Sequence, residues 1–164
     1  MPLQTSPVLS YRDVTTAIDW LCGTLGFKKH LILQEEQGSI RYAQLTLGGG
    51  MIMVAPIRGT VLDEFLVQPD EVNGAETQSS YFFVADLNAH YVRATSAGAE
   101  IIVDKMDHDG ARRGYSCRDP EGHIWNFGSF NPWAGDDAKA SRPFGSAFTA
   151  AVSTFMSAML TALT

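Results

Sequence analysis

The same order of predicted strands and helices occurs twice along the chain. The second set lies 73 residues after the first, so that Asp86 corresponds to Asp13. Each aspartate follows a short apolar run and precedes an apolar helical pattern, which is where an Asp side chain caps a helix. Each helical pattern stops at a glycine, Gly26 or Gly98, and strand patterns follow. Few aligned letters are identical, so the repeat rests on pattern and spacing. The sequence therefore predicts an α+β fold made of two modules, each with the order βαβββ.

Strand patterns and turn residues give approximate bounds for these elements. The first module is predicted to hold an extended run at 7–11, a helix, and strands at 28–35, 40–47 and 51–56. The second is predicted to hold an extended run at 81–84, a helix, a strand at 100–103 and a hairpin at 115–128. The resulting division is a first module at 1–57, a linker at 58–78, a second module at 79–131 and a tail at 132–164.

Composition and charge limit the kinds of partner. The chain has 164 residues and is 45% hydrophobic, which is enough to build a buried core. Its net charge is −6 and its basic residues are scattered, so no nucleic-acid surface is expected. Cys22 and Cys117 lack metal or redox spacing, and the start of the sequence lacks a secretory pattern. We therefore expect reduced thiols in a cytoplasmic protein.

The last part of the sequence, residues 144–164, contains no charged side chain. Its apolar residues follow helical spacing: Phe148, Val152, Phe155, Met156, Met159 and Leu163. Ser and Thr are too frequent there for a membrane span. The pattern predicts a C-terminal helix that packs on its own domain or on a second subunit, and contact with a second subunit is favoured.

The hairpin of the second module turns at residues 119–122, Asp-Pro-Glu-Gly, which suit a type I turn. Direct pairing across this turn predicts Cys117 opposite Ile124 and Tyr115 opposite Asn126. All four side chains would then lie on one face of the sheet.

Four short motifs together resemble those of the vicinal oxygen chelate superfamily, the group of glyoxalases, bleomycin resistance proteins and extradiol dioxygenases. They lie at residues 11–13, 25–27, 84–86 and 119–125. The resemblance covers about residues 5–131. It implies that the two modules form a curved, mixed eight-stranded sheet around a cavity, commonly in a homodimer that exchanges modules between chains.

The resemblance also implies where a metal would be held. Metal enzymes of this family take ligands from the first and last strands of both modules. These positions fall at Ser6, Met53, Ser79 and Asn126 of this sequence. Divalent ions in such sites prefer imidazole and carboxylate groups. These four positions offer two hydroxyls, a thioether and an amide. We therefore expect no metal centre and no cofactor.

The same positions mark the cavity side of each strand, because side chains alternate between faces. The residues expected to line the cavity are Val8, Ser10, Met51, Met53, Tyr81, Phe83, Tyr115, Cys117, Ile124 and Asn126. This apolar and aromatic lining suits a flat organic ligand. The alternative interpretation is that some of these side chains fill the sheet as core.

Three functions are compatible with the sequence, and the first is favoured. It is a metal-free binding protein that sequesters a hydrophobic or aromatic compound, cationic ones included, as bleomycin-resistance relatives do with antibiotics. The second is a lyase, isomerase or dioxygenase that uses a metal at other residues, or works without one through Tyr115, His123 or Arg113. The third is an interaction or regulatory module that uses the C-terminal helix. No catalytic residue is assigned, and a homodimer with no membrane contact is expected.

Overall fold

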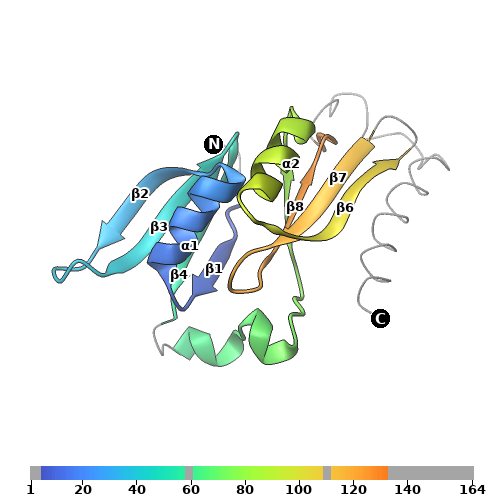
Figure 1. Ribbon diagram of the computed structural model, residues 1–164. Helices are drawn as coiled ribbons and strands as arrows, with labels where there is room; N and C mark the ends of the chain where they lie inside the picture. The colour runs from blue at the N-terminus through green and yellow to red at the C-terminus, as the bar shows by residue number, and fades with distance from the viewer. Residues whose placement is uncertain (1–4, 58–60, 109–111, 133–164) are drawn as a thin grey trace, which may run out of the picture.

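Both predicted modules are present in the computed structural model, which describes residues 5–57, 61–108 and 112–132 (Figure 1). The first contains β1 (Val8–Tyr11), α1 (Val14–Trp20), the π-helical turn η1 (Leu21–Leu25), β2 (Lys28–Gln34), β3 (Ile40–Leu47) and β4 (Gly50–Pro56). The second contains β5 (Ser80–Phe83), α2 (Leu87–Ser96), β6 (Glu100–His108), β7 (Arg112–Arg118) and β8 (Ile124–Gly128). The predicted C-terminal helix lies outside the described residues.

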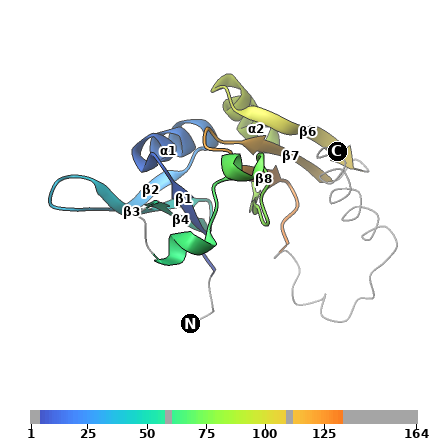
Figure 2. The same cartoon turned by 90° about the horizontal axis from the view of Figure 1, so that it is seen from below.

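A linker with two short 3-10 helices, η2 (Val61–Phe65) and η3 (Pro69–Val72), joins the modules. Figure 2 shows the linker and α1 on opposite sides of the first sheet. None of the helices in the described ranges has the length and apolar character of a membrane span.

Each module forms its own four-stranded mixed sheet. The strand orders are β1-β4-β3-β2 and β5-β8-β7-β6, with β1 parallel to β4, β5 parallel to β8 and the remaining pairs antiparallel. The α+β class and the βαβββ order are thus confirmed. The single eight-stranded sheet that the resemblance implied is not what the described chain forms, because no ladder joins the two sheets. They lie side by side (Figure 1).

The repeat is visible in the backbone at the start of each helix. Asp13 has φ −116° and ψ 86°, and its side chain accepts a hydrogen bond from the amide of Thr16. Asp86 has φ −112° and ψ 86°, and its side chain accepts from the amide of Ala89. Both aspartates therefore cap their helices in the same way, as the 73-residue offset predicts.

The two modules share one apolar core. Phe27, at the start of the first module's β2, places its ring 5.2 Å from that of Phe82 and 5.6 Å from that of Trp125, with edge-on geometry in both pairs. Two α2 side chains also bind carbonyl groups at the end of η1: His90 contacts the oxygen of Leu25, and Arg93 donates to those of Cys22 and Gly23. Aromatic packing and satisfied helix-end carbonyls thus hold the modules together.

The predicted register of the hairpin was wrong by one residue. Tyr115 pairs with Phe127, and Cys117 pairs with Trp125, so Ser116 is the residue opposite Asn126. The cause is Gly122, whose φ of +99° adds one residue after the type I turn, in the manner of a G1 bulge. A one-residue shift moves side chains to the other face of the sheet. Tyr115 and Cys117 are consequently fully buried core residues.

Asp119 connects this hairpin to both modules. Its Oδ2 accepts hydrogen bonds from the Tyr11 hydroxyl at 2.7 Å and from Trp125 Nε1 at 3.0 Å. Its Oδ1 accepts from the backbone amides of Glu121 and His123, both at 3.0 Å. The carboxylate is only 4% exposed, so it is buried with all of these donors directed at it.

Replacing Asp119 with alanine should lower the free energy of unfolding by about 3–5 kcal/mol, because buried donors on Tyr11 and Trp125 lose their acceptor. Urea denaturation followed by tryptophan fluorescence measures the change. Asp104→Ala is the matched control, since Asp104 also accepts from a tyrosine, Tyr91 at 2.6 Å, but at an exposed position. Equal losses in the two variants would contradict a special role for the buried carboxylate.

Candidate functional site

The first module leaves one face of its sheet uncovered by α1. Along β4, Ile52 and Val54 are fully buried in the core, whereas Met51 and Met53 are half-buried on the opposite face. Met53 lies beside Val8, which is 59% exposed, and Ser10 follows on the same face of β1. The four residues predicted in this module therefore share the open face.

The second module exposes its corresponding face at the edge strand β5, whereas Ser116 and Asn126 on that face are buried. Tyr81 and Phe83 are 38% and 45% exposed, while Phe82 between them is buried in the core. Tyr81 lies opposite Asn126 in the parallel ladder, and the half-buried Ile124 is on the same face of β8. Four of the six positions predicted in this module are thus on the open face, and the register shift removes the other two, Tyr115 and Cys117.

The two positions transferred to this module as metal-ligand sites do meet. Asn126 donates from Nδ2 to the Ser79 hydroxyl at 2.8 Å and to the Ser80 carbonyl at 3.2 Å. Its Oδ1 accepts from the Ser116 hydroxyl at 2.6 Å. In the first module, Met53 binds the Pro7 carbonyl through its backbone amide, next to Ser6. The parallel pairs Val8–Met53 and Tyr81–Asn126 therefore preserve the offset of the repeat.

This donor set does not fit a divalent metal. The side-chain amide of Asn126 is engaged at both ends by hydrogen bonds within the second module, and it is 3% exposed. Hydroxyl, thioether and neutral amide groups are weak ligands compared with imidazole or carboxylate. Within the ranges that the structure describes, no group of three or more His, Cys, Asp or Glu residues is placed to share an ion.

A pocket of about 600 Å³ lies where β1, the start of β5, the hairpin and the linker meet. The predicted residues Val8, Ser10 and Ile124 line it, and so does Ser79. Its remaining apolar wall comes mainly from the linker: Phe65, Leu66, Val67, Pro69, Val72 and Ala75. Met51, Met53, Tyr81, Phe83 and Asn126 are on the open faces but outside this pocket.

The sequence allows two interpretations of the linker: a lid over a pocket, or a segment that only packs on the modules, and it favours the second. The linker's apolar residues at 61–66 are visible in the sequence and predict a helical turn, but a linker that only packs on the modules explains the same pattern. Phe65 is 77% exposed, Val67 is 62% exposed and Leu66 is 49% exposed. Large apolar side chains left in solvent beside a pocket indicate a surface that binds something.

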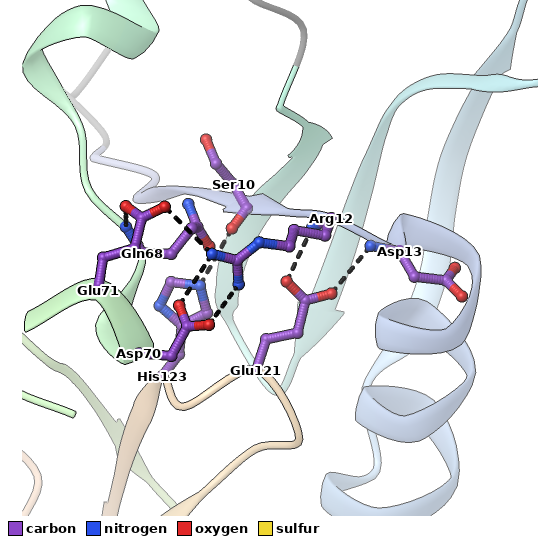
Figure 3. Close-up of polar contacts among 8 residues, drawn as sticks. All are labelled: Ser10, Arg12, Asp13, Gln68, Asp70, Glu71, Glu121 and His123. Carbon is purple, nitrogen blue, oxygen red and sulfur yellow. Dashed lines mark hydrogen bonds and ion pairs between the residues drawn. The ribbon is translucent and has the colours of Figure 1, made fainter. Parts of the chain in front are cut away.

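His123 and Glu76 are the ionisable residues of the pocket wall (Figure 3 shows His123). The His123 Nδ1 is 2.7 Å from Glu76 Oε1, and its Nε2 is 3.1 Å from the Ser10 carbonyl oxygen. Burial lowers the pKa of His123, but the hydrogen bond to Glu76 and the charge of Asp119 outweigh burial and raise it above its ordinary value. Both ring nitrogens face acceptors, so the protonated imidazole satisfies both.

A second set of polar contacts near His123 joins the linker and the hairpin to the segment between β1 and α1 (Figure 3). The Arg12 guanidinium donates to both carboxylate oxygens of Asp70, at 3.0 and 2.9 Å, and to Glu71 at 3.2 Å. Glu121 of the hairpin accepts from the backbone amides of Arg12 and Asp13, at 2.8 and 2.9 Å. These exposed pairs contribute little free energy each, but they fix the linker and hairpin against the start of α1.

The Tyr115 hydroxyl and the Cys117 thiol lie in the core. The Tyr115 hydroxyl is 2.7 Å from His90 Nδ1, and burial raises the pKa of that hydroxyl far above its ordinary value. Burial also raises the pKa of the Cys117 thiol to about 12. Neither residue lines the pocket. The side chain of Arg113 lies outside the described part of the structure.

Comparison with known proteins places this geometry in context. The family model described as "Glyoxalase/Bleomycin resistance protein/Dioxygenase superfamily" matches residues 5–127. The crystal structure of TioX from Micromonospora sp. ML1 is 32% identical, with a TM-score of 0.61, and the match covers 77% of this chain and 94% of that one. No curated protein matches the sequence.

More distant structures share the fold. The fosfomycin resistance protein FosX from Listeria monocytogenes is 11% identical, with a TM-score of 0.57, and the match covers 80% of this chain and 96% of that one. A glyoxalase/bleomycin resistance protein from Streptomyces sp. CB03234 is 15% identical, with a TM-score of 0.52 and coverage of 75% and 98%.

Replacing Asn126 with aspartate, an isosteric change to a carboxylate, should destabilise the protein by about 2–4 kcal/mol at pH 8. The buried charge would face the Ser80 carbonyl, which now accepts a hydrogen bond from the amide. The loss should grow as the pH rises above about 4, the ordinary pKa of aspartate in the unfolded chain. Thermal and urea unfolding at several pH values check this. Asn88→Asp, on the exposed surface of α2, controls for the added charge.

Proposed function

Because the chain belongs to the glyoxalase/bleomycin resistance protein/dioxygenase superfamily, we propose that it binds a small apolar or aromatic organic molecule in the pocket beneath the linker. The pocket itself carries the proposal. Its volume of about 600 Å³ is within the range of roughly 300–1,000 Å³ typical of small-molecule sites, and most of its wall is apolar. Organic antibiotics are one class of compound that fits this description.

The charges in the pocket support a neutral ligand. Glu76 and His123 are its ionisable lining residues, and they lie 2.7 Å apart as an ion pair that neutralises itself. A cation would gain no net attraction from this pair, while it would lose its hydration on entering. A cationic aromatic compound, which the acidic composition made conceivable, is therefore the less favoured ligand.

The same contacts support binding in preference to catalysis. A general base needs a nitrogen or oxygen with an available lone pair directed at the substrate. His123 uses both ring nitrogens on Glu76 and Ser10. Tyr115 and Cys117 are buried outside the pocket. Sequestration of the compound is accordingly the function we propose.

The neutral aromatic probe N-phenyl-1-naphthylamine should bind more tightly than ethidium, a planar molecule with a permanent positive charge. Its fluorescence should increase on binding. Replacing Val8 with aspartate should weaken the probe's affinity at least about tenfold, because a carboxylate then lies in the apolar wall. Fluorescence titration measures both affinities.

The matched control for this experiment is Val92→Asp on α2. Val92 is 60% exposed, almost the same as Val8 at 59%, but it lies outside the pocket. Equal affinities in the two variants would place the bound probe elsewhere on the protein. Failure of every neutral aromatic probe to bind would contradict the proposed function.

We also propose that the protein works as a homodimer in which a second copy covers the open sheet faces. Each face presents large apolar side chains to solvent: Leu31, Leu33, Tyr81 and Phe83 are each between 38% and 45% exposed. Burial of such side chains is the main favourable term in subunit association. A second copy placed there would also enclose the two Met residues and the outer side of the pocket.

Replacing Phe83 with glutamate should shift the protein from dimer toward monomer, as measured by light scattering over a range of concentrations. Val92→Glu, with a similar gain of charge on α2, should leave the mass unchanged. Removing residues 140–164 tests the alternative that the C-terminal segment forms the dimer interface. If that deletion alone yields monomers while Phe83→Glu does not, the open faces are not the interface.

A further inference from the structure

Three segments far apart in the sequence meet at one imidazole. His123 is part of the hairpin, Glu76 belongs to the linker, and Ser10 belongs to β1. Glu76 makes a second contact, because its Oε2 accepts from the backbone amide of Ile124 at 2.8 Å. The Glu76 carboxylate therefore attaches the end of the linker to the hairpin. The other ring nitrogen of His123 attaches β1 to the same hairpin through the Ser10 carbonyl.

Each ring nitrogen of His123 lies within hydrogen-bond distance of an oxygen atom, so a ring with protons on both nitrogens donates to both. A carbonyl oxygen such as that of Ser10 only accepts, and the ionised Glu76 carboxylate only accepts. A neutral imidazole carries one N–H, so it would direct a lone pair at one of these two oxygens. That arrangement costs more than a lost hydrogen bond, because the contacts are more than half buried. The contact pattern is therefore complete only in the protonated form.

The charged groups around the ring agree with this state. Glu76 faces it from the linker at 2.7 Å, and the Asp119 carboxylate adds negative charge from the hairpin. The Tyr11 ring from β1 packs edge-on at 4.8 Å, with its hydroxyl donated to Asp119. Arg12, the nearby cation in the polar cluster of Figure 3, is itself paired with Asp70 and Glu71.

Resting on the proposed function, we propose that His123 and Glu76 form a proton-controlled latch that holds the linker against β1 and β8 and keeps the ligand pocket closed. When the imidazole loses a proton, one of its two contacts is lost. The linker end that carries Thr77, Gln78 and Ser79, all pocket-lining, then keeps the bond from Ile124 to Glu76 and the bond from Asn126 to Ser79, but loses a contact at the imidazole. The pocket wall loosens, and ligand binding weakens.

The direction with pH follows from the raised pKa of His123. A group whose folded-state pKa is above its unfolded value contributes stability that is complete below the unfolded pKa, near 6.5. That contribution disappears as the pH rises through the folded-state pKa. The latch is therefore closed in mildly acidic solution and opens in alkaline solution.

The latch is tested first on the protein without ligand. NMR titration of the imidazole signals should show His123 losing its proton at lower pH in Glu76→Gln than in the wild type, while Glu64→Gln, an exposed glutamate of the same linker, should leave it unchanged. Hydrogen exchange of amides 68–79, corrected for intrinsic rates, should lose protection over the same pH range. Protection should fall by up to about tenfold for each unit between the folded and unfolded pKa values.

A second arm measures the affinity for N-phenyl-1-naphthylamine from pH 6 to pH 9. We expect the wild type and His30→Gln to bind more weakly as the pH rises, and His123→Gln to bind with no pH dependence. Probe binding that does not change with pH, together with unchanged exchange in the linker, would overturn the latch and leave the proposed function intact. A pH-dependent linker in a protein that binds no probe would overturn the proposed function and leave the latch intact.

Discussion

The buried carboxylate of Asp119 is the contact on which the other features of this structure depend. It accepts from Tyr11 at the end of β1, from Trp125 in β8 and from two amides of its own turn. The same side chain thus shapes the hairpin and joins a strand of each module. It also adds negative charge beside His123 and thereby favours the protonated ring. A buried anion with this many donors is satisfied only in one arrangement of these segments.

The modules contact one another through side chains of both helices and strands, and no ladder joins their two sheets in the described residues. Phe27 packs on aromatic residues of the second module, and the α2 side chains of His90 and Arg93 bind the carbonyls at the end of η1. The opposite face of the first sheet is left partly exposed, and in the second module β5 exposes Tyr81 and Phe83. The pocket forms beside β1 because the linker has to cross there on its way between modules, with Arg12 and Glu76 fixing its position. The wall of this pocket comes from the linker as well as from the strands.

Asn126 has a structural role in the second module. Asn126 connects strands of the second module by binding Ser79, Ser80 and Ser116. A carboxylate at that position accepts hydrogen bonds but donates none, so the present network is specific to an amide. Asn126, at a position where the resemblance places a metal ligand, therefore helps to hold the second sheet together.

The sequence by itself determined the two βαβββ modules, their 73-residue offset and the helix caps at Asp13 and Asp86, because these depend on local periodicity and side-chain capping. The resemblance singled out Ser79 and Asn126, and the two side chains are in hydrogen-bond contact. Tertiary structure decided what depends on single-residue register and on long-range contact. The left-handed Gly122 moved Tyr115 and Cys117 into the core, which a turn motif alone does not reveal. Tertiary structure likewise decided that the linker forms a pocket wall, where Glu76 and His123, 47 residues apart, are in contact. No local sequence pattern predicts a contact between residues so far apart.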